Sequence, residues 1–106
     1  MPSALITGGS GFFGGLLKRH LLKQGWECTN IDLVKDEDQD PALTSIQGDI
    51  RDKSLLETVF GANRFDSVFH CAAILAHGAP DKRFLWTSNV DGTRNIAEAA
   101  ARHGVK

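Results

Sequence analysis

The residues best suited to chemistry are the glycines of the stretch ITGGSGFFGG, residues 6–15. Gly9, Gly11 and Gly14 fit the spacing GxGxxG, and with Gly8 in place of Gly9 the same glycines fit GxxGxxG. In either spacing the first glycine permits a tight turn, the second lets a pyrophosphate approach the backbone, and the third lets a helix pack closely on a strand. Free N–H groups at the helix N-terminus would bind the phosphates. The glycines alone are equally compatible with a flexible turn between a strand and a helix.

An acidic residue farther along the chain favours phosphate binding over a flexible turn. Asp32 closes an apolar run 18 residues after Gly14, near the spacing of about 20 that is typical of a carboxylate bound to the adenosine ribose diol. A carboxylate accepts hydrogen bonds from a 2′-hydroxyl but repels a 2′-phosphate, so we expect NAD in preference to NADP, although Lys35 opposes this preference. A P-loop is excluded because no Lys-Ser or Lys-Thr follows the glycines at the required place.

Short β-rich runs alternate with longer helical patterns and must position these residues. We expect strands over residues 4–7, 26–33, 44–47 and 67–71. This alternation is typical of βαβ units. The expected fold class is therefore α/β, a Rossmann-type doubly wound parallel sheet that is incomplete, with about four strands and three helices.

Three helices are expected between the strands. The first follows the glycines and ends before Gly25, and its apolar stripe is made of Phe13, Leu16, Leu17, Leu21 and Leu22. The second begins at Asp52, a good N-cap residue, and ends at Gly61. The third lies between residues 81 and 103, with a small-residue face made of Val90, Ala97 and residues 99–101.

Composition and charge exclude several functional classes. Twelve Lys and Arg against thirteen Asp and Glu give a net charge of -1, which argues against sequence-independent binding to nucleic acid or an anionic membrane. No apolar run approaches the ~20 residues of a membrane span, so we expect a cytoplasmic protein. Cys28 and Cys71 lack CxxC spacing and are expected to be buried reduced thiols, with no metal site. Residues 35–42, KDEDQDPA, are expected to form a solvated acidic loop.

Four ordered motifs resemble those of the extended short-chain dehydrogenase/reductases, in particular the NAD-dependent epimerase/dehydratase family. TGGSGFFG, residues 7–14, resembles the family's TGxxGxxG loop. This match favours the spacing that starts at Gly8 and implies that the Phe12 and Phe13 amides bind the pyrophosphate. GDI, residues 48–50, is similar to the third-strand motif, and it implies that Asp49 binds the adenine amino group and that Ile50 packs on the ring or bonds to it.

The two later motifs extend the resemblance over essentially the whole chain. HCAA, residues 70–73, is similar to the fourth-strand HxAA and implies that Ala72 and Ala73 lie under the cofactor. NVDGTRNIAEAA, residues 89–100, is similar to the helix NVxGTxNxLEAA and implies a cofactor-side role for Asn89. Simpler roles stay open: a turn residue for Asp49, core packing for the alanines and a helix cap for Asn89. His70 is expected to be a core histidine.

The sequence also departs from the family's pattern. The family's acid/base residues are a Ser or Thr and a YxxxK motif, and these 106 residues contain no tyrosine. We therefore assign no catalytic residue. We expect residues 1–106 to be the N-terminal part of an NAD(P)-binding Rossmann domain whose later strands and substrate domain are absent. Such a segment is expected to bind NAD weakly at best and to be inactive by itself.

The resemblance implies the dinucleotide-binding portion of an epimerase, dehydratase or related oxidoreductase that acts on a nucleotide sugar or similar alcohol. A noncatalytic module that senses a dinucleotide is the alternative. A fragment that folds only by association is a third possibility, because an open sheet edge can pair with another copy. The family's dimer contact implies a homodimer through the helix at 81–103, with residues 83–86 facing the partner.

Overall fold

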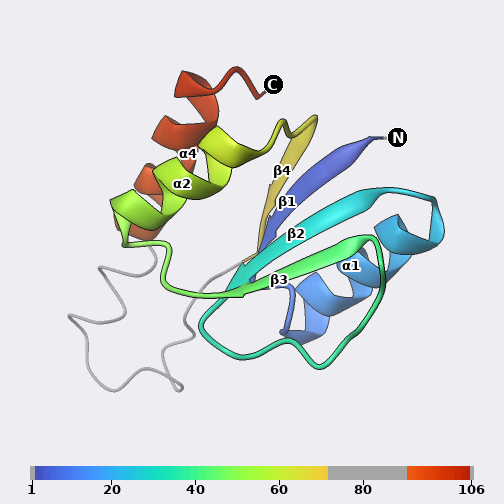
Figure 1. The fold of residues 1–106 in the computed structure, drawn as a ribbon. Helices are drawn as coiled ribbons and strands as arrows, with labels where there is room; N and C mark the ends of the chain where they lie inside the picture. The colour runs from blue at the N-terminus through green and yellow to red at the C-terminus, as the bar shows by residue number, and fades with distance from the viewer. Residues whose placement is uncertain (1, 72–90, 106) are drawn as a thin grey trace.

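The computed structural model of the chain describes residues 2–71 and 91–105. The strands are β1 (Ser3–Thr7), β2 (Glu27–Asp32), β3 (Leu43–Gln47) and β4 (Ser67–His70). They form one sheet in the order β3-β2-β1-β4, and all three neighbouring pairs are parallel (Figure 1). The four predicted strands and the Rossmann-type α/β class are thereby confirmed.

Helices cover both faces of this sheet. Helix α1 (Phe12–Lys23) lies on one face, and α2 (Lys53–Ala62) and α4 (Gly92–Arg102) lie together on the other (Figure 1). The parallel register pairs Thr7 with Ile31 on one side and with His70 on the other. The carboxyl ends of β1, β2 and β4 therefore meet at one edge of the sheet, where ligands bind in open α/β sheets.

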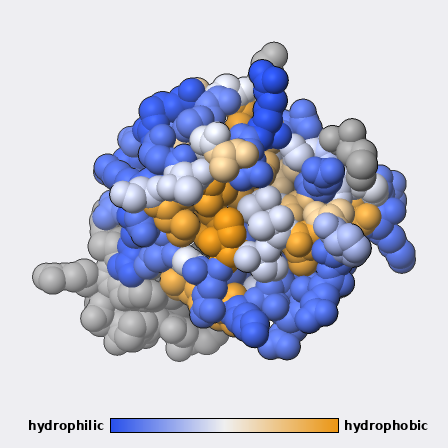
Figure 2. Space-filling view, in the orientation of Figure 1, coloured by the Kyte–Doolittle hydropathy of each residue, from blue (hydrophilic) through white to orange (hydrophobic). Residues whose placement is uncertain are grey.

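Helix α2 begins where the sequence predicts. The Asp52 side chain accepts a hydrogen bond from the Leu55 amide at 3.1 Å, as an N-cap residue does. Leu56, Val59 and Phe60 are buried, and they form the centre of a large apolar cluster beneath α2 and α4. Figure 2 shows hydrophobic residues at the middle of the viewed face, with hydrophilic residues around them.

The predicted apolar stripe of α1 is wrong in part. Phe13 is 70% exposed and Leu16 is 51% exposed, whereas Leu21 is buried. The reason is the close approach of Gly14 to the strand, which turns positions 14, 18 and 21 toward the sheet. Lys18 therefore lies on the inner side of the helix, where the sequence suggests no charged residue.

The predicted small-residue face of α4 also needs correction. Ala97 and Ala101 are exposed, and the buried positions are Gly92, Asn95, Ile96 and Ala99. Gly92 determines which face of α4 turns toward the sheet, because a Cβ there would lie 2.6 Å from the Ile50 side chain. Residues 81–90 of the predicted helix, with Val90, lie outside the described residues.

Two smaller expectations can also be compared with the structure. Cys28 is buried as predicted and Cys71 is half-buried, and both are free thiols. Burial raises the pKa of each above its ordinary value. Within the part of the chain that the structure describes, no helix has the length and apolarity needed to cross a bilayer, and no group of three or more potential metal ligands is found.

Candidate functional site

The glycine loop joins β1 to α1, and its glycines differ in whether the fold requires them. Gly8 has a φ of +74°, which favours glycine. A Cβ on Gly14 would lie 2.2 Å from the Gly8 carbonyl oxygen. A Cβ on Gly11 would meet only that oxygen, at an ordinary 3.4 Å, so packing within the chain does not require a glycine there. The fold therefore requires glycine at positions 8 and 14, whereas the exposed Gly11 has room for a side chain or a ligand beside it.

Three consecutive amides anchor this loop to β2. Gly8 N–H donates to the Ile31 carbonyl at 3.0 Å, a backbone contact between the loop and the strand. Gly9 N–H donates to Asn30 Oδ1 at 2.7 Å, and Ser10 N–H donates to Asp32 Oδ2 at 2.9 Å. Side chains near the end of β2 therefore hold the turn in one conformation.

The first turn of α1 has free hydrogen-bond donors. Gly11 is the N-cap residue and supplies no side-chain cap. Gly15 N–H is the first of the helix amides to find a backbone acceptor, at the Gly11 carbonyl. Among residues 2–71 and 91–105, nothing accepts a hydrogen bond from the amides of Phe12, Phe13 and Gly14. Such a helix terminus attracts anions, because the free N–H groups and the helix dipole both favour negative charge.

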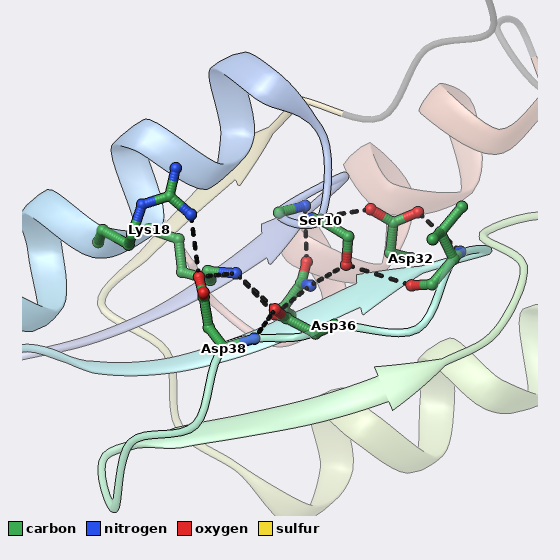
Figure 3. Close-up of polar contacts among 9 residues, drawn as sticks. Ser10, Lys18, Asp32, Asp36 and Asp38 are labelled. Atoms are coloured by element: carbon green, nitrogen blue, oxygen red, sulfur yellow. Dashed lines mark hydrogen bonds and ion pairs between the residues drawn. The ribbon is translucent and has the colours of Figure 1, made fainter.

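Asp32 lies beside this helix terminus, at the carboxyl end of β2. Its Oδ2 accepts from Ser10 N–H, and its Oδ1 accepts from Val34 N–H at 3.1 Å (Figure 3). Each carboxylate oxygen has a further acceptor position. The half-exposed Asp32 can therefore accept two additional hydrogen bonds, as the vicinal hydroxyls of a ribose would require.

Asp49 and Ile50 follow β3, next to Asp32 along the edge of the sheet. The Gly48 amide donates to the Asp32 carbonyl at 2.9 Å and joins the ends of the two strands. The Arg51 guanidinium contacts the Asp49 carboxylate at 2.6 Å and lowers the pKa of Asp49. Burial acts in the opposite direction, but the pKa stays below its ordinary value. Asp49 and Arg51 line an open pocket of about 610 Å³.

The Ile50 side chain does not face that pocket. It is 7% exposed and packs in the core against Gly92. Its carbonyl accepts from Asn95 Nδ2 at 3.2 Å, which ties the end of β3 to α4. Packing of its side chain on a ring in that pocket therefore has no support in this arrangement, and a bond from Ile50 to the ring stays a prediction.

His70 joins three elements at the same edge. Its Nδ1 lies 2.6 Å from Thr7 Oγ1 of β1, and its Nε2 lies 2.8 Å from Thr93 Oγ1 of α4. Burial lowers the pKa of His70 below its ordinary value, which favours the neutral ring that such a bridge between hydroxyls uses. Three predicted site residues, Ala72, Ala73 and Asn89, lie outside the described residues.

Sequence reasoning missed two residues that the site depends on. Asn30 is 1% exposed and holds Gly9, and Lys18 is 1% exposed and contacts Asp36. The expectation that residues 35–42 form a solvated loop is wrong for Asp36, whose side chain is only 3% exposed. A signal was present: Asn30 is polar within a buried strand run and precedes Asp32 by two residues, so both side chains lie on the same face of the sheet.

The chain is similar to known proteins in sequence and in fold. A family model described as the NAD dependent epimerase/dehydratase family matches residues 4–106. The UDP-glucose 4-epimerase of Neisseria meningitidis serogroup A is 36% identical over 99% of this chain and 34% of its own length. A putative dihydroflavonol 4-reductase of Synechocystis is 35% identical over 95% of this chain and 29% of its own length.

A solved structure gives the same result. The crystal structure of the Bordetella bronchiseptica enzyme WbmG in complex with NAD and UDP is 36% identical, with a TM-score of 0.87 over 97% of this chain and 35% of that chain. The chain thus spans about a third of the length of the relatives that it matches. With the family model matched over nearly all of its residues, the chain belongs to the NAD-dependent epimerase/dehydratase family.

Proposed function

We propose that the chain binds NAD at the carboxyl edge of its sheet. The observation that carries this proposal is the free first turn of α1, where the amides of residues 12–14 face no acceptor among the described residues beside a loop anchored to β2. The residues present fit the cofactor, because Gly11 leaves open space where a pyrophosphate would approach and Asp32 retains acceptor positions for a ribose. When bound, NAD supplies a hydride acceptor.

The proposal gives the other predicted residues definite roles. Asp32 would hold the adenosine ribose and repel a 2′-phosphate, so NAD would bind in preference to NADP. Asp49 would accept from the adenine amino group in the pocket that it lines with Arg51, and Ile50 would contact the ring through its backbone. Ala72, Ala73 and Asn89 keep their predicted cofactor-side roles, which rest on the sequence motifs alone.

For the whole protein we propose an NAD-dependent epimerase, dehydratase or reductase that acts on a nucleotide sugar or similar alcohol. The support is family membership, together with relatives named as UDP-glucose 4-epimerases and a neighbour that holds NAD and UDP. In this proposal residues 1–106 are the N-terminal part of the cofactor-binding domain and position NAD without catalysing the reaction. The noncatalytic sensing role, the homodimer and the cytoplasmic location stay predictions.

Titration with NADH and NADPH at matched salt, followed by nicotinamide fluorescence, tests the binding proposal. We expect tighter binding of NADH than of NADPH. The variant Asp32→Asn should weaken NADH binding on the order of tenfold, because hydrogen bonds to a charged acceptor are worth about 1.5–3 kcal/mol. Glu98→Gln is the matched control, since it removes one negative charge from an exposed position of α4. Tighter binding of NADPH by the unaltered chain would contradict the role of Asp32.

A further inference from the structure

A buried ion pair lies between α1 and the segment that follows β2. Lys18 Nζ lies 2.8 Å from both carboxylate oxygens of Asp36 and 2.8 Å from Asp38 Oδ2 (Figure 3). The side chains of Lys18 and Asp36 are 1% and 3% exposed. A lone buried ammonium would be strongly disfavoured, and the two carboxylates offset the cost of burying this one.

Asp36 connects this ion pair to the glycine loop. Its Oδ2 accepts from Asn30 Nδ2 at 3.0 Å, and its Oδ1 accepts from the Asp38 amide at 3.0 Å. Burial would raise the pKa of Asp36, but the hydrogen bonds from Lys18, the Asp38 amide and Asn30 lower it overall, which keeps the carboxylate ionised. An ionised carboxylate only accepts hydrogen bonds, so it selects the NH₂ end of the Asn30 amide.

The orientation of Asn30 in turn determines the contact with Gly9. With its NH₂ group toward Asp36 and Ser10 Oγ, the amide directs its oxygen at the Gly9 N–H. The loop is packed directly on this amide, since a Cβ on Gly9 would lie 2.5 Å from Asn30 Oδ1. A rotated amide would place NH₂ against N–H and leave a buried donor unsatisfied.

We propose that Lys18 is a positioning residue for the glycine loop, acting through Asp36 and Asn30 on the Gly9 amide. Among the described residues, the Lys18 ammonium contacts Asp36 and Asp38, so it reaches Gly9 through Asp36 and Asn30. The consequence for NAD affinity rests on the proposed function, whereas the effect on Gly9 does not. Loss of the Lys18 charge removes the ion-pair partner of Asp36, whereas Asp38 keeps its contact with Arg19. The Asp36 carboxylate is then no longer held toward Asn30, and the Asn30 amide becomes free to rotate.

Amide hydrogen exchange of the full 106-residue chain tests this proposal. The Gly9 amide reports the loop. The Leu56 amide, which donates to the Asp52 carbonyl and whose side chain lies in the apolar cluster, is the reference on the opposite face of the sheet. In Lys18→Met and in Asp36→Ala we expect Gly9 to exchange about threefold to tenfold faster relative to Leu56, the factor that corresponds to one lost hydrogen bond. Lys18→Arg, which retains the cation, should restore most of the protection.

The controls separate positioning from general stability. Lys23→Met removes the same charge from an exposed position of the same helix and should leave Gly9 unchanged. If Lys18→Met does not fold, Asp36→Ala decides, because it leaves Lys18 paired with Asp38, which Arg19 also contacts. An unchanged Gly9, or equal acceleration of Gly9 and Leu56, would overturn the proposal.

Titration of the same variants with NADH keeps the two proposals distinct. We expect the dissociation constant to rise by about the factor measured at Gly9. If Gly9 responds and NADH affinity does not, the proposed NAD site is contradicted while the positioning role of Lys18 stands. If Gly9 does not respond, the positioning role fails whatever the affinity.

Discussion

Helix α1 and the pair α2 and α4 cover opposite faces of one sheet, but different interactions hold them there. Among the residues that the structure describes, the face under α2 and α4 is an apolar cluster of nine buried residues that includes Leu56 and Phe60. The cluster under α1 has four buried members in the same described ranges, and beside it lies the ion pair of Lys18 with Asp36. Apolar burial is non-directional, whereas hydrogen bonds and ion pairs fix orientation. The comparison suggests that one face stabilises the domain and the other fixes the shape of the glycine loop.

The largest effect should come from the closest backbone contact on the α1 face. Gly14→Ala places a Cβ 2.2 Å from the Gly8 oxygen and 3.1 Å from Gly9 Cα, where only backbone could move aside. We expect a loss of about 4 kcal/mol or more in the free energy of unfolding, measured by urea denaturation.

The adjacent glycine supplies the control for this prediction. A Cβ on Gly15 would meet the flexible end of Arg19 at 3.2 Å. Gly15→Ala should therefore be neutral, or more stable by about 0.5–1 kcal/mol because alanine favours the helix. Equal losses in the two variants would show that the contact with Gly8 is not what requires a glycine at position 14.

A cavity on the opposite face should cost stability without changing the loop. Leu56 is 1% exposed at the centre of the large cluster, so Leu56→Ala should lower the free energy of unfolding by about 3 kcal/mol. The exposed Leu16→Ala is the control and should change it by less than about 0.5 kcal/mol. Apart from the change in the free energy of unfolding measured by urea denaturation, protection of the Gly9 amide should stay unchanged in both variants. A selective loss at Gly9 would break the division between the faces.

Acid should weaken the α1 face in particular. The pKa of Asp36 is lowered in the folded chain. The pKa of Asp38 is lowered as well, chiefly by the hydrogen bond that its carboxylate accepts from Lys18. The stability these groups contribute is therefore present above their unfolded pKa of about 3.9 and is lost as the pH falls through the lower folded values. Urea denaturation between pH 6 and pH 2.5 should show a steeper loss below pH 4 for the unaltered chain than for Asp36→Ala. Asp40→Ala, at an exposed position of the same segment, should keep the steep slope.

The smallest expected effect tests a polar contact on the apolar face. Asp52→Ala removes the N-cap of α2 and should lower the free energy of unfolding by about 1 kcal/mol. Asp52→Asn, which can still accept from the Leu55 amide, should retain most of that stability. A loss near that of Leu56→Ala would mean that directional contacts matter on this face as much as apolar burial does.

The parts of the fold that follow from local pattern were predictable. The strands, the start of α2 at Asp52 and the glycine spacing from Gly8 to Gly14 depend on residues close together in the sequence. The inward face of α1 was not predictable from apolar spacing, because the approach of Gly14 to Gly8 determines its rotation. The face of α4 was missed for the same kind of reason, since it depends on Ile50, a residue distant in the sequence.

The sequence by itself determined the kind of site: a glycine turn before a helix, followed by a carboxylate at the end of the next strand. Only the tertiary structure decided what holds that turn, because Lys18, Asn30 and Asp36 come together through folding and carry no shared motif. It also decided that the Ile50 side chain belongs to the core. Local spacing specifies which backbone groups are free to bind, whereas the burial of a charge depends on partners that only the packed chain brings within reach.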